Sequence, residues 1–229
     1  EALKYADALF NASDSSKFTG FDYTYYGTAL KNDKQYEKAI EMFNKAMVEN
    51  KGNDELVNSN RKALSDLYLA KEDFDKATAY YEEYLNHAPK TTASDMAGLA
   101  TIYMNLAAKQ TGEQQKASFK KADNVYARLG EKFPANLDFA NFMRARINSN
   151  LDPETKEGLA KPFYEAIVNS LANKTDRDKA DNARLTEAYR YLGYYYLVKN
   201  DKAMADGYWK KVLEIDPDNE TAKQALGIK

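Results

Sequence analysis

The sequence predicts an all-α fold in which a unit of two antiparallel helices is repeated along the chain. The clearest unit is the 34-residue run from Thr186 to Asn219, which has two helical segments around the turn Lys199-Asn200-Asp201. Its apolar residues recur at spacings of three and four, as one buried helix face requires. The same pattern fits the windows 20–53 and 58–91, which have the same length. A fixed period of this length predicts a solenoid whose units each contact their neighbours.

Two columns of residue types recur across five copies of the unit. Small residues let the two helix backbones of a unit approach closely, and aromatic rings fill the space between successive units. The aromatic column consists of Phe43, Tyr81, Tyr126, Tyr164 and Trp209, the alanine column of Ala39, Ala77, Ala122, Ala160 and Ala205, and the small residues opposite the alanines are Gly27, Ser65, Ala100 and Gly193.

The N-terminal residues precede the first complete copy and have the pattern of a single helix. In residues 1–10, Ala2, Leu3, Ala6 and Leu9 fall on one helix face. We interpret this segment as the second helix of a preceding, truncated repeat. Because the chain starts at Glu1 within such a unit, we expect it to be a fragment of a longer protein.

Two copies contain insertions. In 93–134 the extra residues are polar and centre on 110–113, so we expect them to lengthen both helices. In 136–173 the run Asp152-Pro153-Glu154 predicts a helix start, with Asp as N-cap and Pro in the first turn. Gly158 and Pro162 should then divide that second helix into a short piece and a longer one.

The C-terminal residues 219–228 predict a capping helix after the last copy. Asn219 is the expected N-cap of a helix over 221–226, and Gly227 is the expected stop. This helix would cover the apolar face that the last unit leaves open.

The pattern resembles the tetratricopeptide repeat, with its large residue, Leu-Gly pair and Tyr, followed by Ala, an aromatic residue, Ala and a closing Pro. The closing Pro is present at Pro89 and Pro134 but is replaced by Lys51 in the first copy and by Ala172 in the fourth. The resemblance covers almost the whole chain. It implies a right-handed alpha-alpha superhelix, a solenoid of antiparallel helix pairs forming a single domain over 1–229, and it favours a bacterial protein.

Composition excludes several classes of function. The net charge of -2 gives no field that would recruit nucleic acid or an anionic membrane. There is no Cys and a single His, His87, which removes thiol chemistry and zinc sites of Cys and His. No apolar run approaches the length of a membrane span. We therefore expect no enzyme, catalytic residue, cofactor or metal. The lack of Cys favours an exported, periplasmic protein over a cytoplasmic one, although cytoplasmic proteins with few Cys are common.

The repeat pattern does not favour a functional role for three other features: the aromatic residues, His87 and the acidic pairs. The 18 Tyr and 10 Phe could form a stacking platform for sugars or bases. Most of them fall in the core columns, so packing explains them better. His87 lies near the end of a second helix with no second His or Cys, and the acidic pairs lie among Lys at turns and helix surfaces.

The resemblance also implies where a ligand would bind. In this family the first helix of each unit lines a concave groove, so side chains beside its core stripe would face a ligand. Arg, Lys, Asn and Tyr among them suit an extended peptide, although an ordinary solvated face is the alternative. The positions are Thr24, Tyr25, Thr28, Lys62, Asp66, Thr101, Asn141, Arg144, Arg190, Tyr191 and Tyr194.

The resemblance disfavours one known ligand class of the family, the C-terminal carboxylates of chaperones, which a subset of its members clamps with Lys and Asn. The matching positions here hold Thr24 and Thr28, then Ala63, then Ser94 and Gly98. These residues do not provide that clamp.

The leading hypothesis for function is a protein- or peptide-binding scaffold, or a chaperone-like assembly module, that uses the concave face. The alternative is a structural or self-associating subunit, which would form a homo-oligomer through its end faces. Glycan or nutrient binding is less favoured because the long loops of repeat proteins with that role are missing. The identity of a protein partner does not follow from the sequence.

Overall fold

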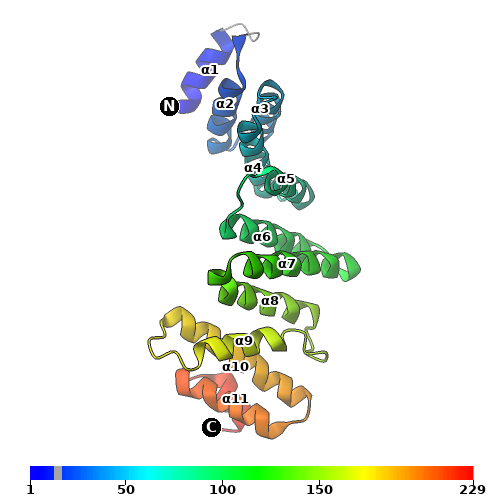
Figure 1. Ribbon diagram of the computed structural model, residues 1–229, viewed down its shortest axis with the longest axis vertical. Helices are drawn as coiled ribbons and strands as arrows, with labels where there is room; N and C mark the ends of the chain where they lie inside the picture. The colour runs from blue at the N-terminus through cyan, green and yellow to red at the C-terminus, as the bar shows by residue number, and fades with distance from the viewer. Residues whose placement is uncertain (13–16, 229) are drawn as a thin grey trace. The chain divides into compact units, whose positions relative to one another are not determined.

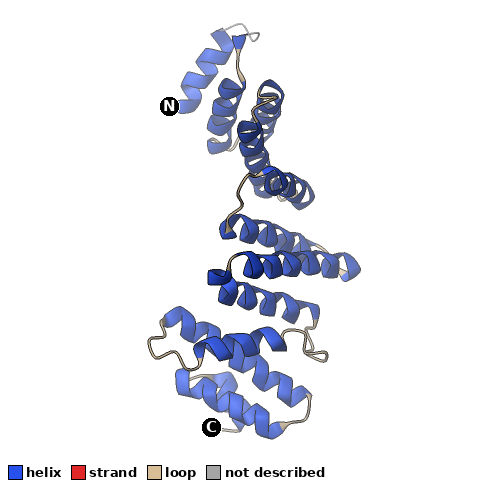
Figure 2. Cartoon of the chain, viewed as in Figure 1, coloured by secondary structure: helices blue, strands red, loops and turns tan. Residues whose placement is uncertain are grey.

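The computed structural model describes residues 1–12 and 17–228, and within these ranges every regular element is a helix (Figure 2). The all-α fold predicted from the sequence is therefore confirmed. None of the described helices combines the length and apolar character that a membrane span requires. The chain divides into two compact units, Glu1–Leu106 and Ala107–Lys229, which are described separately.

Figure 1 labels the helices in chain order. The first unit holds α1 (Ala2–Ala12), α2 (Gly20–Asn32), α3 (Tyr36–Glu49), α4 (Asp54–Ala70), α5 (Phe74–His87) and most of α6 (Ala93–Lys109). The second holds α7 (Gly112–Lys132), the 3-10 helix η2 (Pro134–Asn136), α8 (Leu137–Leu151), α9 (Lys161–Leu171), α10 (Lys179–Val198), α11 (Lys202–Ile215) and α12 (Glu220–Leu226).

Three hairpins, α2/α3, α4/α5 and α10/α11, turn in the same way. Each turn contains one non-glycine residue in the left-handed region: Lys34, Glu72 and Asn200, with φ of 62°, 58° and 59°. The next backbone N–H then bonds to a carbonyl five residues back, as in Gln35 to Leu30 at 2.9 Å. The equivalent bonds in the other hairpins are Asp73 to Tyr68 at 2.9 Å and Asp201 to Tyr196 at 2.8 Å. This shared closure satisfies carbonyls that a helix end would otherwise leave free.

The two column glycines pack against the aromatic residue of their own hairpin. A Cβ added to Gly27 would lie 3.2 Å from the Phe43 ring, and one added to Gly193 would lie 2.8 Å from the Trp209 indole. Phe43 and Trp209 are both buried. The aromatic rings were expected to fill the space between successive units. These two rings also fill the space between the two helices of their own unit.

The predicted helix start at Asp152-Pro153 is wrong. Residues 152–160 form a loop, and α9 begins at Lys161 with Pro162 in its first turn. The buried Asp152 carboxylate accepts backbone N–H bonds from Lys156 at 3.0 Å, Glu157 at 3.0 Å and Gly158 at 2.7 Å. The capping chemistry of Asp was recognised, but here the side chain organises a loop and not a helix.

The second unit ends in the short helix α12, with Asn219 as N-cap and Gly227 as a left-handed C-cap at φ 71°. Ala222 is buried in the same core as Trp209 and Val212, and Leu226 packs against it. Its apolar side thus covers the core of α9–α11, while Thr221 and Gln224 face solvent.

Candidate functional site

The predicted binding residues lie on the first helices of their hairpins. In the structure some of their side chains are exposed and the others are half-buried. Six are exposed on the surface: Tyr25, Thr28, Asp66, Thr101, Arg190 and Tyr194. The other five are half-buried: Thr24, Lys62, Asn141, Arg144 and Tyr191.

The hydroxyl groups of all three threonines donate hydrogen bonds to acceptors of the protein. Thr28 donates to the Thr24 carbonyl at 2.8 Å, and Thr101 donates to the Ala97 carbonyl at 2.9 Å. Thr24 lies 2.9 Å from the Gly20 carbonyl and 3.1 Å from Oδ1 of the buried Asn60. Their oxygens remain able to accept hydrogen bonds.

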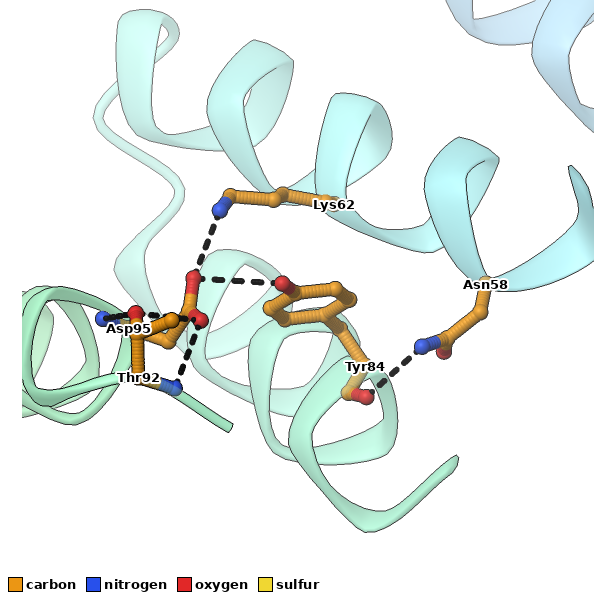
Figure 3. A network of polar contacts seen from close by, with 5 residues as sticks. All are labelled: Asn58, Lys62, Tyr84, Thr92 and Asp95. Carbon is orange, nitrogen blue, oxygen red and sulfur yellow. Dashed lines mark hydrogen bonds and ion pairs between the residues drawn. The ribbon is translucent and has the colours of Figure 1, made fainter. Parts of the chain in front are cut away.

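Lys62 belongs to a polar network that joins α4, α5 and α6 (Figure 3). Its Nζ lies 2.8 Å from Oδ1 of Asp95 and 4.8 Å from the centre of the Tyr84 ring. Tyr84 donates to the same carboxylate oxygen at 3.1 Å, while Thr92 and Asp95 cap the start of α6 through reciprocal bonds. Lys62 is thus held between two first helices and is not a free donor.

Charge explains why this network is stable. Burial alone would raise the pKa of Asp95, but hydrogen bonds from Lys62 and Thr92 lower it from 3.8 to about 2. Burial alone would lower the pKa of Lys62, but the bond to Asp95 raises it above 10.5. Both groups therefore stay charged at neutral pH. Asp66 is engaged in the same way, since its carboxylate lies 3.0 Å from Nζ of Lys31 on α2.

Arg144 faces α7 and α9. Its guanidinium donates two bonds to Asp123 on α7, at 3.0 and 3.1 Å, and stacks 4.3 Å from the centre of the Phe163 ring on α9. The exposed arginine of α8 is instead Arg146, which reaches Glu187 on α10. Arg144 is thus half-buried and paired within the second unit, whereas Arg146 is the more exposed arginine of α8.

Arg190, Tyr191 and Tyr194 come together in a pocket of about 480 Å³ on α10. Tyr194 is 47% exposed, whereas the Tyr191 ring lies 4.7 Å from that of the buried Tyr164. Burial raises the pKa of Tyr191 to about 12, so its hydroxyl stays protonated. The remaining lining residues are Tyr164 on α9, Glu187 on α10, Trp209 on α11 and Thr221 on α12.

Arg190 differs from the other two cations of the predicted set. Lys62 and Arg144 each pair with a carboxylate of the protein. Arg190 is exposed, and among residues 1–12 and 17–228 it has no ion-pair or hydrogen-bond partner. A guanidinium beside an exposed Tyr ring can bind a carboxylate or a carbonyl of a ligand.

Comparison with solved structures identifies the architecture. The C-terminal part of a TPR repeat-containing protein from Cytophaga hutchinsonii is similar at 28% identity, with a TM-score of 0.72 over 98% of this chain and 80% of that chain. YrrB, described as a TPR protein with an unusual peptide-binding site, is similar in fold at 18% identity, with a TM-score of 0.56 over 100% of this chain and 99% of that one. The chain has the helical-repeat architecture of tetratricopeptide-repeat proteins.

No family model and no curated protein matches the sequence of this chain. The departures from the repeat pattern include the missing closing Pro at Lys51 and Ala172 and the loop 152–160 that replaces a helix start. The similarity in structure is thus found even though the sequence departs from the repeat pattern at these positions.

The sequence analysis missed three residues: Arg146 on α8, and Arg184 and Glu187 on α10. Arg146 donates to both oxygens of Glu187, at 2.9 and 2.6 Å. Helical spacing alone could have found Glu187, which precedes Arg190 by three residues, and Arg184, which precedes Glu187 by three. In the first unit, Phe21 was missed although it is 63% exposed one turn before Tyr25.

His87 is the last residue of α5. It lines a hollow of about 530 Å³ in the first unit, together with Lys62, Tyr84 and Lys90. Its Nδ1 lies 2.9 Å from the Glu83 carbonyl one helical turn earlier. This contact suits a residue in the last turn of a helix.

Proposed function

We propose that this tetratricopeptide-repeat protein is a non-catalytic scaffold that binds an extended segment of a partner protein. The observation that carries the proposal is the pocket on α10, where the unpaired Arg190 lies with the exposed Tyr194. Tyr and Arg side chains are among those that contribute most binding energy at protein interfaces. A role as a chaperone-like assembly module is the more specific form of this proposal.

A second patch supports the same function in the first unit. Phe21 and Tyr25, 63% and 56% exposed, lie one turn apart on α2 beside Thr28. Exposed aromatic residues in this spacing offer apolar contact area at low entropic cost. The similarity to YrrB supports the fold of such a scaffold and says nothing of the ligand.

Panning of a peptide-display library on the purified protein tests the proposal. We expect enrichment of peptides that bind the wild-type chain and fail to bind a variant with Arg190→Glu and Tyr194→Ala. A control with Arg128→Glu and Tyr5→Ala changes an exposed arginine and an exposed tyrosine outside the pocket and should retain binding. Peptides that bind all three proteins equally would rule out this surface as the binding site.

A further inference from the structure

The surface around Glu187 carries more positive charge than its own carboxylate can neutralise. Arg184 and Arg190 each lie three residues from Glu187 on α10, one before it and one after it, so each neighbours Glu187 on the helix surface. Arg146 extends to Glu187 from α8. We call Arg146, Arg184 and Arg190 the arginine cluster.

Glu187 is fully engaged by groups of the protein. It accepts two bonds from Arg146, at 2.9 and 2.6 Å, and a third from the Tyr164 hydroxyl at 3.0 Å. A bidentate pair of this kind neutralises one guanidinium. Glu187 is therefore not available to pair with Arg184 or Arg190.

Arg184 is also unpaired within the described ranges, where it has no ion pair or hydrogen bond. The acidic residue one turn before it, Asp181, is held by Lys174 at 2.6 Å. Arg184 and Arg190 thus differ from Lys31 and Lys62, which have carboxylate partners.

Phe142 holds two of the three arginines in position. The guanidinium of Arg146 lies 4.3 Å from the centre of its ring, and that of Arg184 lies 5.6 Å from it. Stacking on an aromatic face leaves the edge of a guanidinium free to donate hydrogen bonds. Arg184 is therefore oriented before a ligand arrives, which reduces the entropy lost on binding.

We infer that the arginine cluster binds side-chain carboxylates of an acidic segment whose neighbouring apolar residue contacts Tyr194. The inference rests on the proposed peptide-binding function and specifies its ligand. Arg184 and Arg190 are six positions apart on α10, which corresponds to a rise of about 9 Å and a rotation of about 120°, with the two residues on either side of Glu187. Alternate side chains of an extended peptide are about 7 Å apart. Long arginine side chains can bridge this difference, so the matching segment is acid-x-acid-x-apolar.

A peptide fits this site better than a nucleic acid does. Binding of a nucleic acid usually requires several neutralised phosphates, and this site offers two unpaired cations on a chain of net charge -2. The Tyr194 ring and the pocket wall of Trp209 and Tyr164 offer apolar surface beside those cations.

Fluorescence anisotropy with two labelled, C-terminally amidated peptides tests the inference on the whole chain. The first is Gly-Ser-Asp-Ser-Asp-Ser-Phe-Ser-Gly, and the second has Asn in place of both Asp. We expect the Asp peptide to bind at least about tenfold more tightly, which corresponds to two charge-assisted bonds. Raising NaCl from about 0.05 M to about 0.3 M should weaken the Asp peptide and leave the Asn peptide nearly unchanged.

Variants locate the effect. A double variant with Arg184→Gln and Arg190→Gln should bind both peptides equally, at the level of the Asn peptide on the wild-type protein. The control Arg128→Gln removes an exposed arginine of α7 and should keep the tenfold preference. A preference that survives in the double variant would show that the acidic residues bind elsewhere and would overturn the inference.

The other outcomes separate this inference from the proposed function. Equal binding of both peptides to the wild-type protein would refute the acidic preference and leave peptide binding intact. No binding of either peptide up to about 1 mM would refute the acidic segment, while library panning would still decide peptide binding independently. Tighter binding of the Asn peptide once its C-terminal carboxylate is free, or of a labelled oligothymidylate, would assign the cluster to a chain end or to a nucleic acid instead.

Discussion

At the residue scale, Asp95 shows how one side chain links two repeats. Its carboxylate caps its own helix through Thr92 and pairs with Lys62 on the first helix of the preceding hairpin. The two partners are separated by 33 positions, close to the repeat length. Lys31 and Asp66 are separated by 35, so pairs of opposite charge about one period apart join successive first helices here.

Asp95→Asn should lower the free energy of unfolding at neutral pH by about 1–2 kcal/mol, because a charged acceptor becomes a neutral amide. The pKa of Asp95 lies at about 2 in the folded protein against an ordinary 3.8. The stabilisation is therefore complete above about pH 4 and is lost as the pH falls toward 2. Urea titrations at several pH values should show the wild-type and Asn curves converging in acid, and a constant difference down to pH 2 would contradict this.

Gly193 tests the close approach of α10 and α11. Alanine in place of a helical glycine gains about 1 kcal/mol from backbone entropy, but at Gly193 the new Cβ would lie 2.8 Å from the Trp209 indole. The matched control is Gly207, which lies in α11 with nothing within 4 Å of its Cβ position. We expect Gly193→Ala to be less stable than Gly207→Ala by about 1–3 kcal/mol in thermal or chemical unfolding; equal stability would mean that the indole can move aside.

At the scale of elements, the sequence predicted regular hairpins and failed at an irregular one. The turns at Lys34, Glu72 and Asn200 recur at equivalent positions, so the period alone located them. The loop 152–160 could not be found in this way, because its organising bonds run from Asp152 to backbone N–H groups four to seven residues ahead. An Asp followed by Pro is equally typical of a helix start, and local sequence does not distinguish the two.

Asp152→Ala should destabilise the second unit by about 1–3 kcal/mol, since several N–H groups lose a charged acceptor in a buried setting. Asp206→Ala is a suitable comparison, because Asp206 pairs only with the exposed Lys202 of its own helix and such pairs contribute little. Differential scanning calorimetry of both variants measures the effect. A loss no larger for Asp152→Ala than for Asp206→Ala would show that the loop does not depend on this carboxylate.

At the scale of the whole molecule, repeat architecture could be predicted but the state of the binding residues could not. The columns fixed which helix faces are buried, and Ala39, Ala77, Ala122, Ala160 and Ala205 are all fully buried. Whether a cation of the predicted set is paired depends on carboxylates from other helices. Arg144 pairs with Asp123, whereas Arg190 has no ion pair within residues 1–12 and 17–228. Periodicity indicates which helix faces are buried and carries no information on those ion pairs.

Repeat proteins should respond to damage locally, because each unit is stabilised mainly by its neighbours. We therefore expect Gly193→Ala to accelerate amide hydrogen exchange in α10, α11 and α12 while leaving α2 and α3 unchanged. Mass-spectrometric exchange on intact protein resolves these helices. Uniform acceleration along the chain would indicate a single cooperative unit instead.

The position of Trp209 has a practical consequence. It is the sole tryptophan of the chain, it is 4% exposed, and it contributes to the wall of the α10 pocket. Tryptophan fluorescence therefore reports on a single hairpin, α10/α11, without any added dye. A spectroscopist can follow melting of the last repeat and arrival of a ligand with the same native chromophore.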